Sequence, residues 1–445
     1  MADTIAAIAT APGRGGIGVI RISGANISDI LRQICGESEL LPRQATLLNF
    51  LGENRETIDQ GIALYFPAPF SFTGENVLEL QGHGGNVVLH RLLERCIHLG
   101  ARLANPGEFT QRAFLNDKID LAQAESIADL IDASSEQAAI SALRSLNGEF
   151  SKAINQVITE LIELRMLVEA TLDFPEEELD ILDNGDVLVK FDTIESHLSQ
   201  VFDSARQGSI LREGMHVVLV GQPNVGKSSL LNCLAGEEIA IVTEIAGTTR
   251  DAIRQNIQIE GVAVHIIDTA GLRKTNDLIE EIGISRTWEA IRQANVALIL
   301  IDATQGLTTE DSEIIEQLPS GLPMLRIFNK IDLLKQAPRV DQHDGIADIY
   351  LSAKERTGVE ILRQQLLSKI GWHQTGEGVF LARERHLVAL RNAHTSLSRA
   401  RSSLMSLEIA AEELRQCQES LSCITGEFTS DDLLGEIFSR FCIGK

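Results

Sequence analysis

A glycine-rich segment constrains the fold of this chain more than any other feature. Residues 221–228 read Gly-Gln-Pro-Asn-Val-Gly-Lys-Ser and fit the pattern G-x-x-x-x-G-K-[ST]. The segment follows the strand-like apolar run 216–220 and precedes a helical pattern that starts at Ser229. In such a strand–loop–helix unit the glycines let backbone N–H groups close around phosphates. Lys227 then supplies a positive charge for the β- and γ-phosphates, and Ser228 offers a hydroxyl to Mg²⁺. The sequence therefore predicts a phosphate-binding loop.

Three more polar segments follow in order, and each comes directly after an apolar run. They are 268–271 (Asp-Thr-Ala-Gly), 329–332 (Asn-Lys-Ile-Asp) and 352–354 (Ser-Ala-Lys), after the runs 264–267, 324–328 and 349–351. Between about 214 and 371, apolar runs alternate with helical patterns, which indicates a parallel sheet with crossover helices. Polar residues at the carboxyl ends of parallel strands meet at one edge of the sheet, so Asp268 is expected beside the metal.

This ordered set resembles the G1, G3, G4 and G5 elements of the Ras-like GTPases. In that family the aspartate of N-K-x-D accepts hydrogen bonds from the guanine N1–H and exocyclic amine, a donor pair that adenine lacks. The resemblance implies that Asp332 selects GTP over ATP. Thr249, within the segment 247–251 (Gly-Thr-Thr-Arg-Asp), is the candidate for the switch threonine that binds Mg²⁺ when the γ-phosphate is present. It joins Lys227 in the expected catalytic set.

The chain departs from the Ras-like pattern where the attacking water is positioned. Ras-like proteins follow D-x-x-G with a glutamine that orients this water, but here Leu272 follows Gly271. Leucine can neither donate nor accept a hydrogen bond, so the water must be oriented from elsewhere. The acidic stretch 277–281 lies where switch II is expected, and Asn224 adds an oxygen ligand close to the phosphates.

These departures narrow the resemblance. Over essentially all 445 residues, the chain closely resembles the MnmE (TrmE) family of tRNA modification GTPases, including the segments 78–85, 113–118 and 441–445. The resemblance implies a potassium-activated enzyme without an arginine finger, in which K⁺ stabilises the transition state. The implied K⁺ ligands are Asn224, Thr243, Ile245 and Thr248. It also implies that Glu280 orients the water, while composition alone leaves the adjacent Glu281 open.

The same resemblance extends the site for GTP and GDP beyond the four motifs and assigns Mg²⁺ to Ser228 and Thr249. The expected nucleotide contacts are Asn224, Val225, Gly226, Lys227, Ser228, Ser229, Thr243, Glu244, Ile245, Ala246, Gly247, Thr248, Thr249, Asp268, Thr269, Ala270, Gly271, Asn329, Lys330, Asp332, Ser352, Ala353 and Lys354. Because a K⁺-binding loop is flexible alone, hydrolysis is expected to need two nucleotide-binding domains to meet. This predicts a homodimer.

Residues 1–118 read as a separate mixed α/β unit. Strand-like runs at 17–22, 61–66 and 77–80 are separated by turns rich in Gly and Pro. A helical pattern at about 86–100 has apolar residues near helical spacing. Both kinds of pattern in one short stretch indicate strands and helices in a single domain.

Helical patterns flank the nucleotide-binding part on both sides. Residues 119–213 and 372–445 are rich in Ala, Leu, Glu and Ser with apolar positions every three or four residues, and Gly148 is a possible break. The predicted fold is α/β plus α. A Ras-like P-loop GTPase domain at 214–371 is inserted into a helical domain, and an α/β domain at 1–118 precedes both.

The family resemblance implies that this first domain is a folate-binding domain, similar to tetrahydrofolate-binding aminomethyltransferases. Its ligand would be a one-carbon derivative, 5-formyl- or methylene-tetrahydrofolate, at Arg21, Glu79, Lys118 and Lys445. Arginine and lysine suit the folate carboxylates, and a glutamate can accept from the pterin N–H groups. Lys445 reaches this site only if the helical tail folds back or a second subunit donates it. Cys442 is either a reactive thiol near the site or an inert terminal cysteine.

The implied function is modification of the wobble uridine of certain tRNAs at C5 by an aminomethyl or carboxymethylaminomethyl group. The implied partner is the flavoprotein MnmG (GidA) in a heterotetramer, with GTP hydrolysis driving a conformational cycle. The rival reading is a regulatory or ribosome-assembly GTPase similar to Era or EngA. Such proteins would carry a KH-type RNA module in a basic context, and no such basic segment is visible in the sequence.

Composition bounds the partners and the compartment. The net charge of −24 repels nucleic acid at long range, so tRNA contact must use local basic patches or a basic partner. Six cysteines without a Cys-x-x-Cys pair argue against a zinc ribbon and against a disulfide framework. The first residues lack a signal-peptide pattern, and no apolar stretch reaches the about 18 residues of a membrane span. A cytoplasmic protein without membrane contact is expected.

Overall fold

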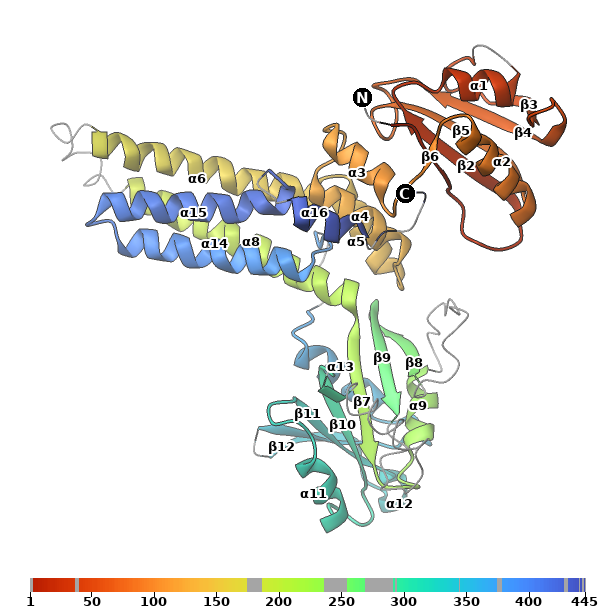
Figure 1. Ribbon diagram of the computed structural model, residues 1–445. Coiled ribbons are helices and arrows are strands. Elements are labelled where there is room, and N and C mark those ends of the chain that lie inside the picture. The colour runs from red at the N-terminus through yellow and green to blue at the C-terminus, as the bar shows by residue number, and fades with distance from the viewer. Residues whose placement is uncertain are drawn as a thin grey trace. The chain divides into compact units, whose positions relative to one another are not determined.

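A computed structural model describes most of the chain (Figure 1). The described residues are 3–36, 40–173, 186–235, 254–268, 291–292, 294–343, 345–373, 378–427, 431–439, 441 and 444. They form two compact units. The first comprises Met1–Ala128 and Glu419–Lys445, and the second comprises Asp129–Gln418.

The first unit is built on a six-stranded sheet with the order β3-β4-β5-β2-β1-β6. Neighbouring strands are antiparallel except β1 and β6, which run parallel. The strands are β1 (Ile5–Ile8), β2 (Gly15–Gly24), β3 (Thr46–Leu51), β4 (Thr57–Phe66), β5 (Asn76–Gly84) and β6 (Arg102–Leu103). The strand-like runs predicted at 17–22, 61–66 and 77–80 are confirmed as parts of β2, β4 and β5.

Two helices cover one face of this sheet, α1 (Ser28–Cys35) and α2 (Asn86–His98). Apolar strand residues, among them Ile20, pack against these helices in a buried core. Because successive side chains of a strand point to opposite faces, Arg21 of β2 points away from the helices. Arg21 pairs with Glu79 of β5 in the strand register, so both residues share the other face.

The remaining helices of the first unit surround a smaller core. α3 (Glu108–Leu115) and α4 (Leu121–Ile131) follow the sheet in sequence, whereas α16 (Asp431–Ser439) lies close to the C-terminus. The rings of Phe114 and Phe438 lie 6.4 Å apart between centroids, within a cluster of buried apolar residues from α4 and α16. The end of the chain therefore packs against residues near position 120.

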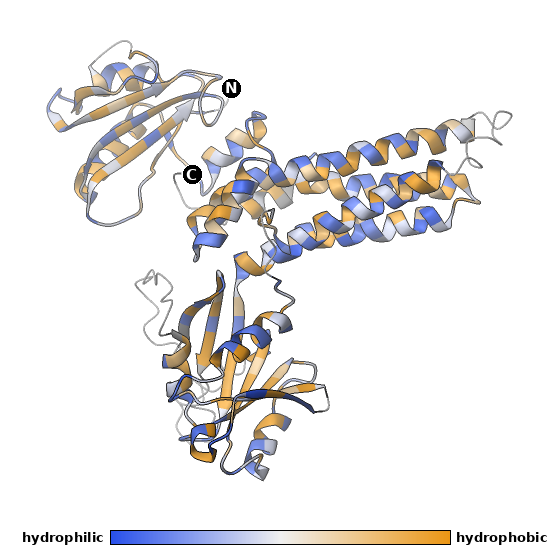
Figure 2. Cartoon of the chain, turned by 180° about the vertical axis from the view of Figure 1, so that it is seen from behind, coloured by the Kyte–Doolittle hydropathy of each residue, from blue (hydrophilic) through white to orange (hydrophobic). Residues whose placement is uncertain are grey.

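A bundle of long helices forms part of the second unit. α8 packs against both α6 and α14, and Figure 2 shows hydrophilic and hydrophobic residues alternating along these helices, as amphipathic packing requires. The helices are α5 (Glu136–Leu146), α6 (Glu149–Asp173), α8 (Asp186–Glu213), α14 (Glu384–Ser402) and α15 (Leu407–Thr425), whose last turns belong to the first unit. The break predicted at Gly148 is confirmed, because this residue separates α5 from α6 with φ 83°.

A seven-stranded sheet with the order β12-β13-β11-β10-β7-β9-β8 also belongs to the second unit. Figure 2 shows its central strands as largely hydrophobic, as expected for a sheet covered on both faces. The strands are β7 (Met215–Gly221), β8 (Arg254–Ile259), β9 (Val262–Asp268), β10 (Val296–Asp302), β11 (Met324–Asn329), β12 (Arg339–His343) and β13 (Ile346–Tyr350). The apolar runs predicted before the four motifs coincide with β7, β9, β11 and β13.

The prediction of a parallel sheet holds for the five central strands and is wrong at both edges. β8 and β12 each run antiparallel to their neighbour. Glu260 and Gly261 form a two-residue turn between β8 and β9, with φ 49° and 81°. Two positive φ values match the twist of a tight hairpin, and a connection this short leaves no room for a crossover helix.

Helices cover both faces of the seven-stranded sheet. α9 (Lys227–Ala235) and α13 (Val359–Lys369) pack on one face, and α11 (Thr309–Glu316) packs on the other. The short helix α12 (Ile331–Leu334) directly follows β11. In the described part of the chain, none of the helices combines membrane-spanning length with the low charge that a lipid core requires.

The bundle and the sheet are joined by one residue on the entry side. α8 ends at Glu213 and β7 begins at Met215, so Gly214 alone lies between them. Gly214 has φ 70°, and a Cβ there would lie 2.6 Å from the carbonyl oxygen of Ala263. Only glycine fits both the left-handed backbone and this close approach.

Candidate functional site

The phosphate-binding loop predicted at 221–228 connects β7 to α9. Both of its glycines have positive φ, 155° at Gly221 and 101° at Gly226. A Cβ on Gly226 would lie 2.4 Å from Nδ2 of Asn329, and one on Gly221 would lie 2.4 Å from the carbonyl oxygen of Leu300. A side chain at either position would therefore push the loop away from its neighbours.

Lys227 begins α9 and its ammonium group folds over the loop. Its Nζ donates to the carbonyl oxygens of Gly221 at 2.5 Å and Gln222 at 3.1 Å. Ser228 and Ser229 follow in the first turn and are exposed. Backbone N–H groups in the first turn of a helix have no acceptor within that helix. With the lysine charge beside them, they suit a phosphate group.

The N-K-x-D segment joins the phosphate-binding loop to the S-A-K segment. Asn329 is 3% exposed, and its Nδ2 donates to the carbonyl oxygen of Val225 at 2.9 Å. Its Oδ1 accepts from the backbone N–H of Ala353 at 3.0 Å. The hydroxyl of Ser352 donates to Oδ1 of Asp332 at 2.7 Å. The structure thus brings three of the four predicted motifs together at one edge of the sheet.

The other described positions lie at the ends of neighbouring strands. Lys330 follows β11, and its Nζ lies 2.7 Å from Oδ2 of Asp302 at the end of β10. Lys354 is exposed beyond β13. Asp268 ends β9 and is the register partner of Leu219 in β7, so its backbone reaches the same edge, while its side chain lies outside the described part.

Asn224 is the predicted K⁺ ligand that falls within the described residues. Its side chain is exposed and its φ is 64°, a left-handed conformation that asparagine tolerates. An exposed amide oxygen on the phosphate-binding loop is a suitable ligand for K⁺. The predicted positions outside the described residues are Thr243, Glu244, Ile245, Ala246, Gly247, Thr248, Thr249, Thr269, Ala270, Gly271, Glu280, Cys442 and Lys445.

The predicted folate positions Arg21 and Glu79 form an ion pair on the face of the six-stranded sheet that α1 and α2 leave uncovered. Oε1 of Glu79 lies 3.0 Å from Nε and 2.9 Å from Nη2 of Arg21. The guanidinium carbon of Arg21 also lies 5.8 Å from the ring centroid of Phe72 and 5.9 Å from that of Phe109. These distances are within the range of cation–π attraction.

The C-terminal tail reaches the same place. The carbonyl oxygen of Gly444 accepts from Nη1 of Arg21 at 3.4 Å, and a Cβ on Gly444 would lie 2.5 Å from the carbonyl oxygen of Ile8. Gly444 therefore lies against the six-stranded sheet of its own chain. Lys118 does not share the contacts of Arg21. Its Nζ donates to the carbonyl oxygen of Pro69 at 3.0 Å.

Sequence reasoning missed polar residues that support the nucleotide site. Nε2 of Gln222 donates to Oγ1 of Thr308 at 2.7 Å and to Oδ1 of the buried Asp311 at 3.0 Å. Thr308 and Asp311 form a capping box at the start of α11, a pattern that the sequence displays. Asp302 ends the apolar run 296–301, the same signal that marked the other motifs. The hydrogen bonds of Gln222 join residues more than 80 positions apart in the sequence, and no local sequence pattern predicts them.

Comparison with known proteins gives two family matches along the chain. The profile of the MnmE helical domain matches residues 121–442. The profile of the N-terminus of the GTP-binding protein TrmE matches residues 4–118. Together these two matches extend from near the N-terminus to the last residues.

Individual relatives match over their full length. A protein of Chromobacterium violaceum is 59% identical over 442 residues, which is 99% of this chain and 98% of the relative. One of Nitrosomonas europaea is 59% identical over 448 residues, which is 100% of this chain and 99% of the relative. Both are named tRNA modification GTPase MnmE. A solved structure of an Aquifex aeolicus Era variant bound to GDP and AlF4⁻ is 26% identical, covering 41% of this chain and 66% of that chain with a TM-score of 0.29. The chain belongs to the MnmE family and is a GTPase.

Proposed function

We propose that this protein is a tRNA modification GTPase that binds GTP at the edge of the seven-stranded sheet and releases GDP. The observation that carries the nucleotide assignment is Asn329, whose amide joins Val225 of the phosphate-binding loop to Ala353 beside β13. The segments expected to bind the phosphates and the base are therefore linked directly through Asn329. Asp332, held by Ser352, accepts from the guanine N1–H and exocyclic amine, which adenine does not present together.

The proposal assigns hydrolysis to two residues of the phosphate-binding loop, Lys227 and Ser228, together with Thr249 and Glu280. Lys227 binds the β- and γ-phosphates, and the exposed hydroxyl of Ser228 fits a Mg²⁺ ligand, with Thr249 as the second. Mg²⁺, when bound, neutralises charge that develops on the phosphate oxygens. Leu272 stands where Ras-like proteins carry glutamine, so another group must orient the attacking water, and the family resemblance assigns that role to Glu280.

The same proposal assigns K⁺ to Asn224 together with Thr243, Ile245 and Thr248. The exposed amide of Asn224 on the loop supports this ion, because carbonyl oxygens are hard ligands suited to it. A cation there supplies the positive charge that an arginine finger gives in other GTPases. We propose that two copies of the chain meet through their nucleotide-binding domains in a homodimer.

We further propose four segments with distinct roles. Residues 1–118 form a folate-binding domain, 119–213 and 372–445 form a helical domain, and 214–371 form the inserted nucleotide-binding domain. The Arg21–Glu79 pair supports the folate site, because it offers a cation and an acceptor on one face. Phe72 and Phe109 lie beside it, and aromatic rings suit a flat pterin. Lys118 and Lys445 complete this site for a one-carbon tetrahydrofolate.

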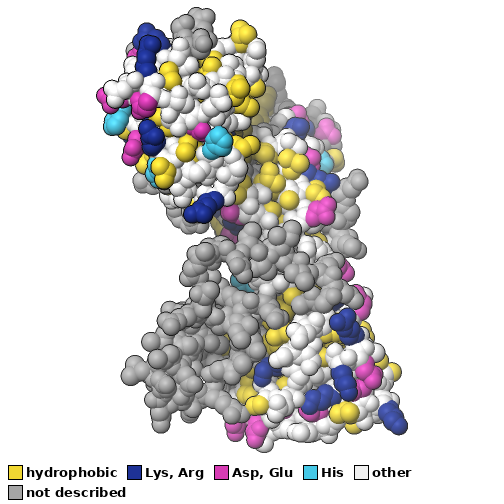
Figure 3. All heavy atoms as spheres, turned by 90° about the vertical axis from the view of Figure 1, so that its right-hand side faces the viewer, with side chains coloured by type: hydrophobic (Ala, Val, Ile, Leu, Met, Phe, Trp, Pro, Cys, Tyr) yellow, Lys and Arg dark blue, Asp and Glu magenta, His cyan; other side chains and the backbone are white. Residues whose placement is uncertain are grey.

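In the proposed reaction the folate supplies the one-carbon unit for C5 of the wobble uridine of tRNA, with the flavoprotein MnmG as partner in a heterotetramer. The surface of the first unit visible in Figure 3 carries basic and acidic side chains interspersed among hydrophobic ones. A surface of mixed sign attracts a polyanion weakly. We therefore propose that MnmG supplies much of the grip on tRNA.

GTP hydrolysis in KCl and in NaCl tests the nucleotide part of the proposal. Wild-type protein should turn over at least about tenfold faster in KCl, since removing one oxyanion-stabilising group costs about 10²–10³ in rate. Asn224→Ala should be equally slow in both salts. Equal wild-type rates would remove the potassium assignment. Purified protein that prefers adenine nucleotides would remove the guanine assignment.

Binding of 5-formyltetrahydrofolate separates this proposal from an Era- or EngA-like regulatory GTPase. Titration calorimetry should show a site on the wild-type chain that does not depend on nucleotide. Absence of binding by a protein that hydrolyses GTP would favour the regulatory reading.

A further inference from the structure

The lysine of the N-K-x-D segment is held by a carboxylate that the motif does not contain. β10 ends at Asp302 and β11 ends at Asn329, and these two residues are partners in the parallel register. Lys330 follows at once, and its Nζ donates to Oδ2 of Asp302 at 2.7 Å. The end of β10 is thereby tied to the turn that leads out of β11.

Asp302 is itself fixed from its other side. Its Oδ1 accepts from the backbone N–H of Thr304 at 3.0 Å and from the Thr304 hydroxyl at 2.6 Å. Burial works to raise the pKa of Asp302, but the bonds from Lys330 and Thr304 outweigh it and hold that pKa below its usual value. Both oxygens of Asp302 are thus engaged within the protein, and the link from Asp302 to the N-K-x-D segment runs through Lys330.

Lys330 needs such an anchor because of its backbone. Its φ is 70°, a left-handed conformation that is unfavourable for a residue other than glycine. The residues on either side depend on that bend. Asn329 points to the phosphate-binding loop through Val225, and Asp332 points to Ser352. The ion pair between Lys330 and Asp302 opposes relaxation of the turn. It therefore preserves the orientations of the Asn329 and Asp332 side chains.

We propose that Asp302 is a positioning residue for guanine recognition: by holding Lys330, it fixes the turn that aims Asp332 at the base. This inference rests on the proposed role of Asp332. It predicts that loss of the Asp302 charge weakens discrimination between bases more than it slows the chemical step.

The test compares GTP with inosine triphosphate, which keeps the N1–H but lacks the exocyclic amine. For the wild-type full-length chain, KM for inosine triphosphate should exceed KM for GTP by roughly tenfold or more, the effect of one hydrogen bond to a charged group. Asp302→Asn keeps the size but loses the charge. It should raise KM for GTP by roughly tenfold and bring the two KM values within about threefold, while kcat for GTP changes by less than about threefold.

Asp341→Asn is the matched control. It breaks a different ion pair in the same unit, Arg339–Asp341 on β12, whose side chains are 43% and 38% exposed. A surface pair of this kind contributes little, so the KM ratio should stay at the wild-type value. Asp302→Glu retains the carboxylate and should recover most of the discrimination. Thr304→Ala, which removes one bond to Asp302, should shift the ratio in the same direction by a smaller factor and serves if Asp302→Asn does not fold.

The outcomes are separable. A wild-type protein that treats GTP and inosine triphosphate alike would overturn the proposed base recognition by Asp332. A discriminating wild type, together with an unchanged KM ratio in folded Asp302→Asn or in Thr304→Ala, would overturn the positioning role alone. A lower melting temperature with an unchanged ratio would show that Asp302 only stabilises the fold and would also overturn that role.

Discussion

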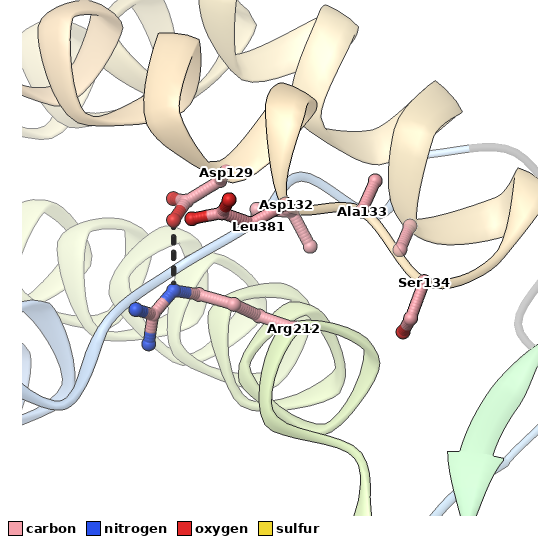
Figure 4. A pocket seen from close by; sticks show the side chains of 7 residues that line it. Asp129, Asp132, Ala133, Ser134, Arg212 and Leu381 are labelled. Atoms are coloured by element: carbon pink, nitrogen blue, oxygen red, sulfur yellow. Dashed lines mark hydrogen bonds and ion pairs between the residues drawn. The ribbon is translucent and has the colours of Figure 1, made fainter. Parts of the chain in front are cut away.

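Nε of Arg212 donates to Oδ1 of Asp129 across 2.9 Å. Arg212 is the penultimate residue of α8, and Figure 4 shows the pair beside a small pocket that Ser134 and Leu381 also line. The same carboxylate oxygen accepts from Nη2 of Arg383 at 2.8 Å, just before α14. One carboxylate therefore holds the chain both where it enters the seven-stranded sheet and where it returns to the bundle.

The returning segment is also fixed along α8. The side-chain amide of Gln207 donates to the carbonyl oxygen of Gly371 at 2.8 Å and accepts from the N–H of His373 at 3.2 Å. A Cβ on Gly208 would lie 1.9 Å from the carbonyl oxygen of Phe380. These contacts require a buried amide and a glycine at successive positions of one helix, so entry and return form a single structural connection.

Replacing Asp129 by Asn tests this connection. Two arginines would lose their shared counter-ion, and Arg383 is only 14% exposed. We expect a loss of about 1–3 kcal/mol in the free energy of unfolding, measured by urea denaturation. Hydrogen exchange should rise at residues 378–383. Asp132→Asn, at an exposed position nearby, should change stability by less than about 0.5 kcal/mol. Equal effects of the two substitutions would contradict the connection.

Asp332→Asn should change which base the site accepts. Its carboxylate accepts from two donors of guanine, whereas an asparagine amide offers one acceptor and one donor. Xanthine carries an oxygen where guanine carries the amine, so the variant should lose affinity for GTP by at least about 100-fold and gain affinity for xanthosine triphosphate. Competition binding with both nucleotides measures this. Retained preference for GTP would show that Asp332 does not read the base.

The first unit should owe part of its stability to a carboxylate–arginine cluster that fails in acid. Glu108 and Arg112 lie 2.9 Å apart with side chains 10% and 9% exposed, and Arg102 also binds Glu108. Burial works to raise the pKa of Glu108, but the bonds from Arg102, Asn105 and Arg112 hold it below 4.5. A lowered pKa in the folded state gives stability that is present above pH 4.5 and lost as pH falls.

Glu108→Gln isolates this contribution. At pH 7 the variant should melt at a lower temperature than wild type, because Arg102 and Arg112 lose a charged partner. As pH falls through the lowered pKa of Glu108, wild-type Glu108 takes up a proton and the melting temperatures of the two proteins should converge. Calorimetry between pH 7 and pH 3 follows the gap. A gap independent of pH would mean that the charge of Glu108 contributes nothing.

Arg21→Ala should weaken binding of 5-formyltetrahydrofolate. The substitution removes the cation that lies beside Glu79, Phe72 and Phe109 and leaves Glu79 without its ion-pair partner. We expect affinity to fall by at least about tenfold, the effect of one charge-assisted hydrogen bond. Arg91→Ala on α2 is the control, because that residue is exposed and lies on the covered side of the sheet. Unchanged affinity in Arg21→Ala would place the folate elsewhere.

Local patterns predicted the parts of this molecule that depend on neighbours in sequence. Apolar runs gave the strands before each motif, and Gly148 marked the helix break. Pairings across long separations left no pattern in one sequence. Asp129 and Arg383 are 254 positions apart, and Arg21 and Gly444 are 423 apart. The edge strand β8 was not predicted, because its hairpin turn, Glu260-Gly261, lacks the asparagine or aspartate that usually precedes glycine in such a turn.

The single glycine between α8 and β7 couples the orientation of the long helix to that of the strand. α8 has 28 residues and so extends about 42 Å at about 1.5 Å per residue. Gly214 packs closely against Ala263, which limits the movement of α8 relative to β7. A strand that tilts by about 10° would swing the distal tip of such a lever by roughly 7 Å. The length of α8 would therefore enlarge, at the far end of the helix, any tilt of β7.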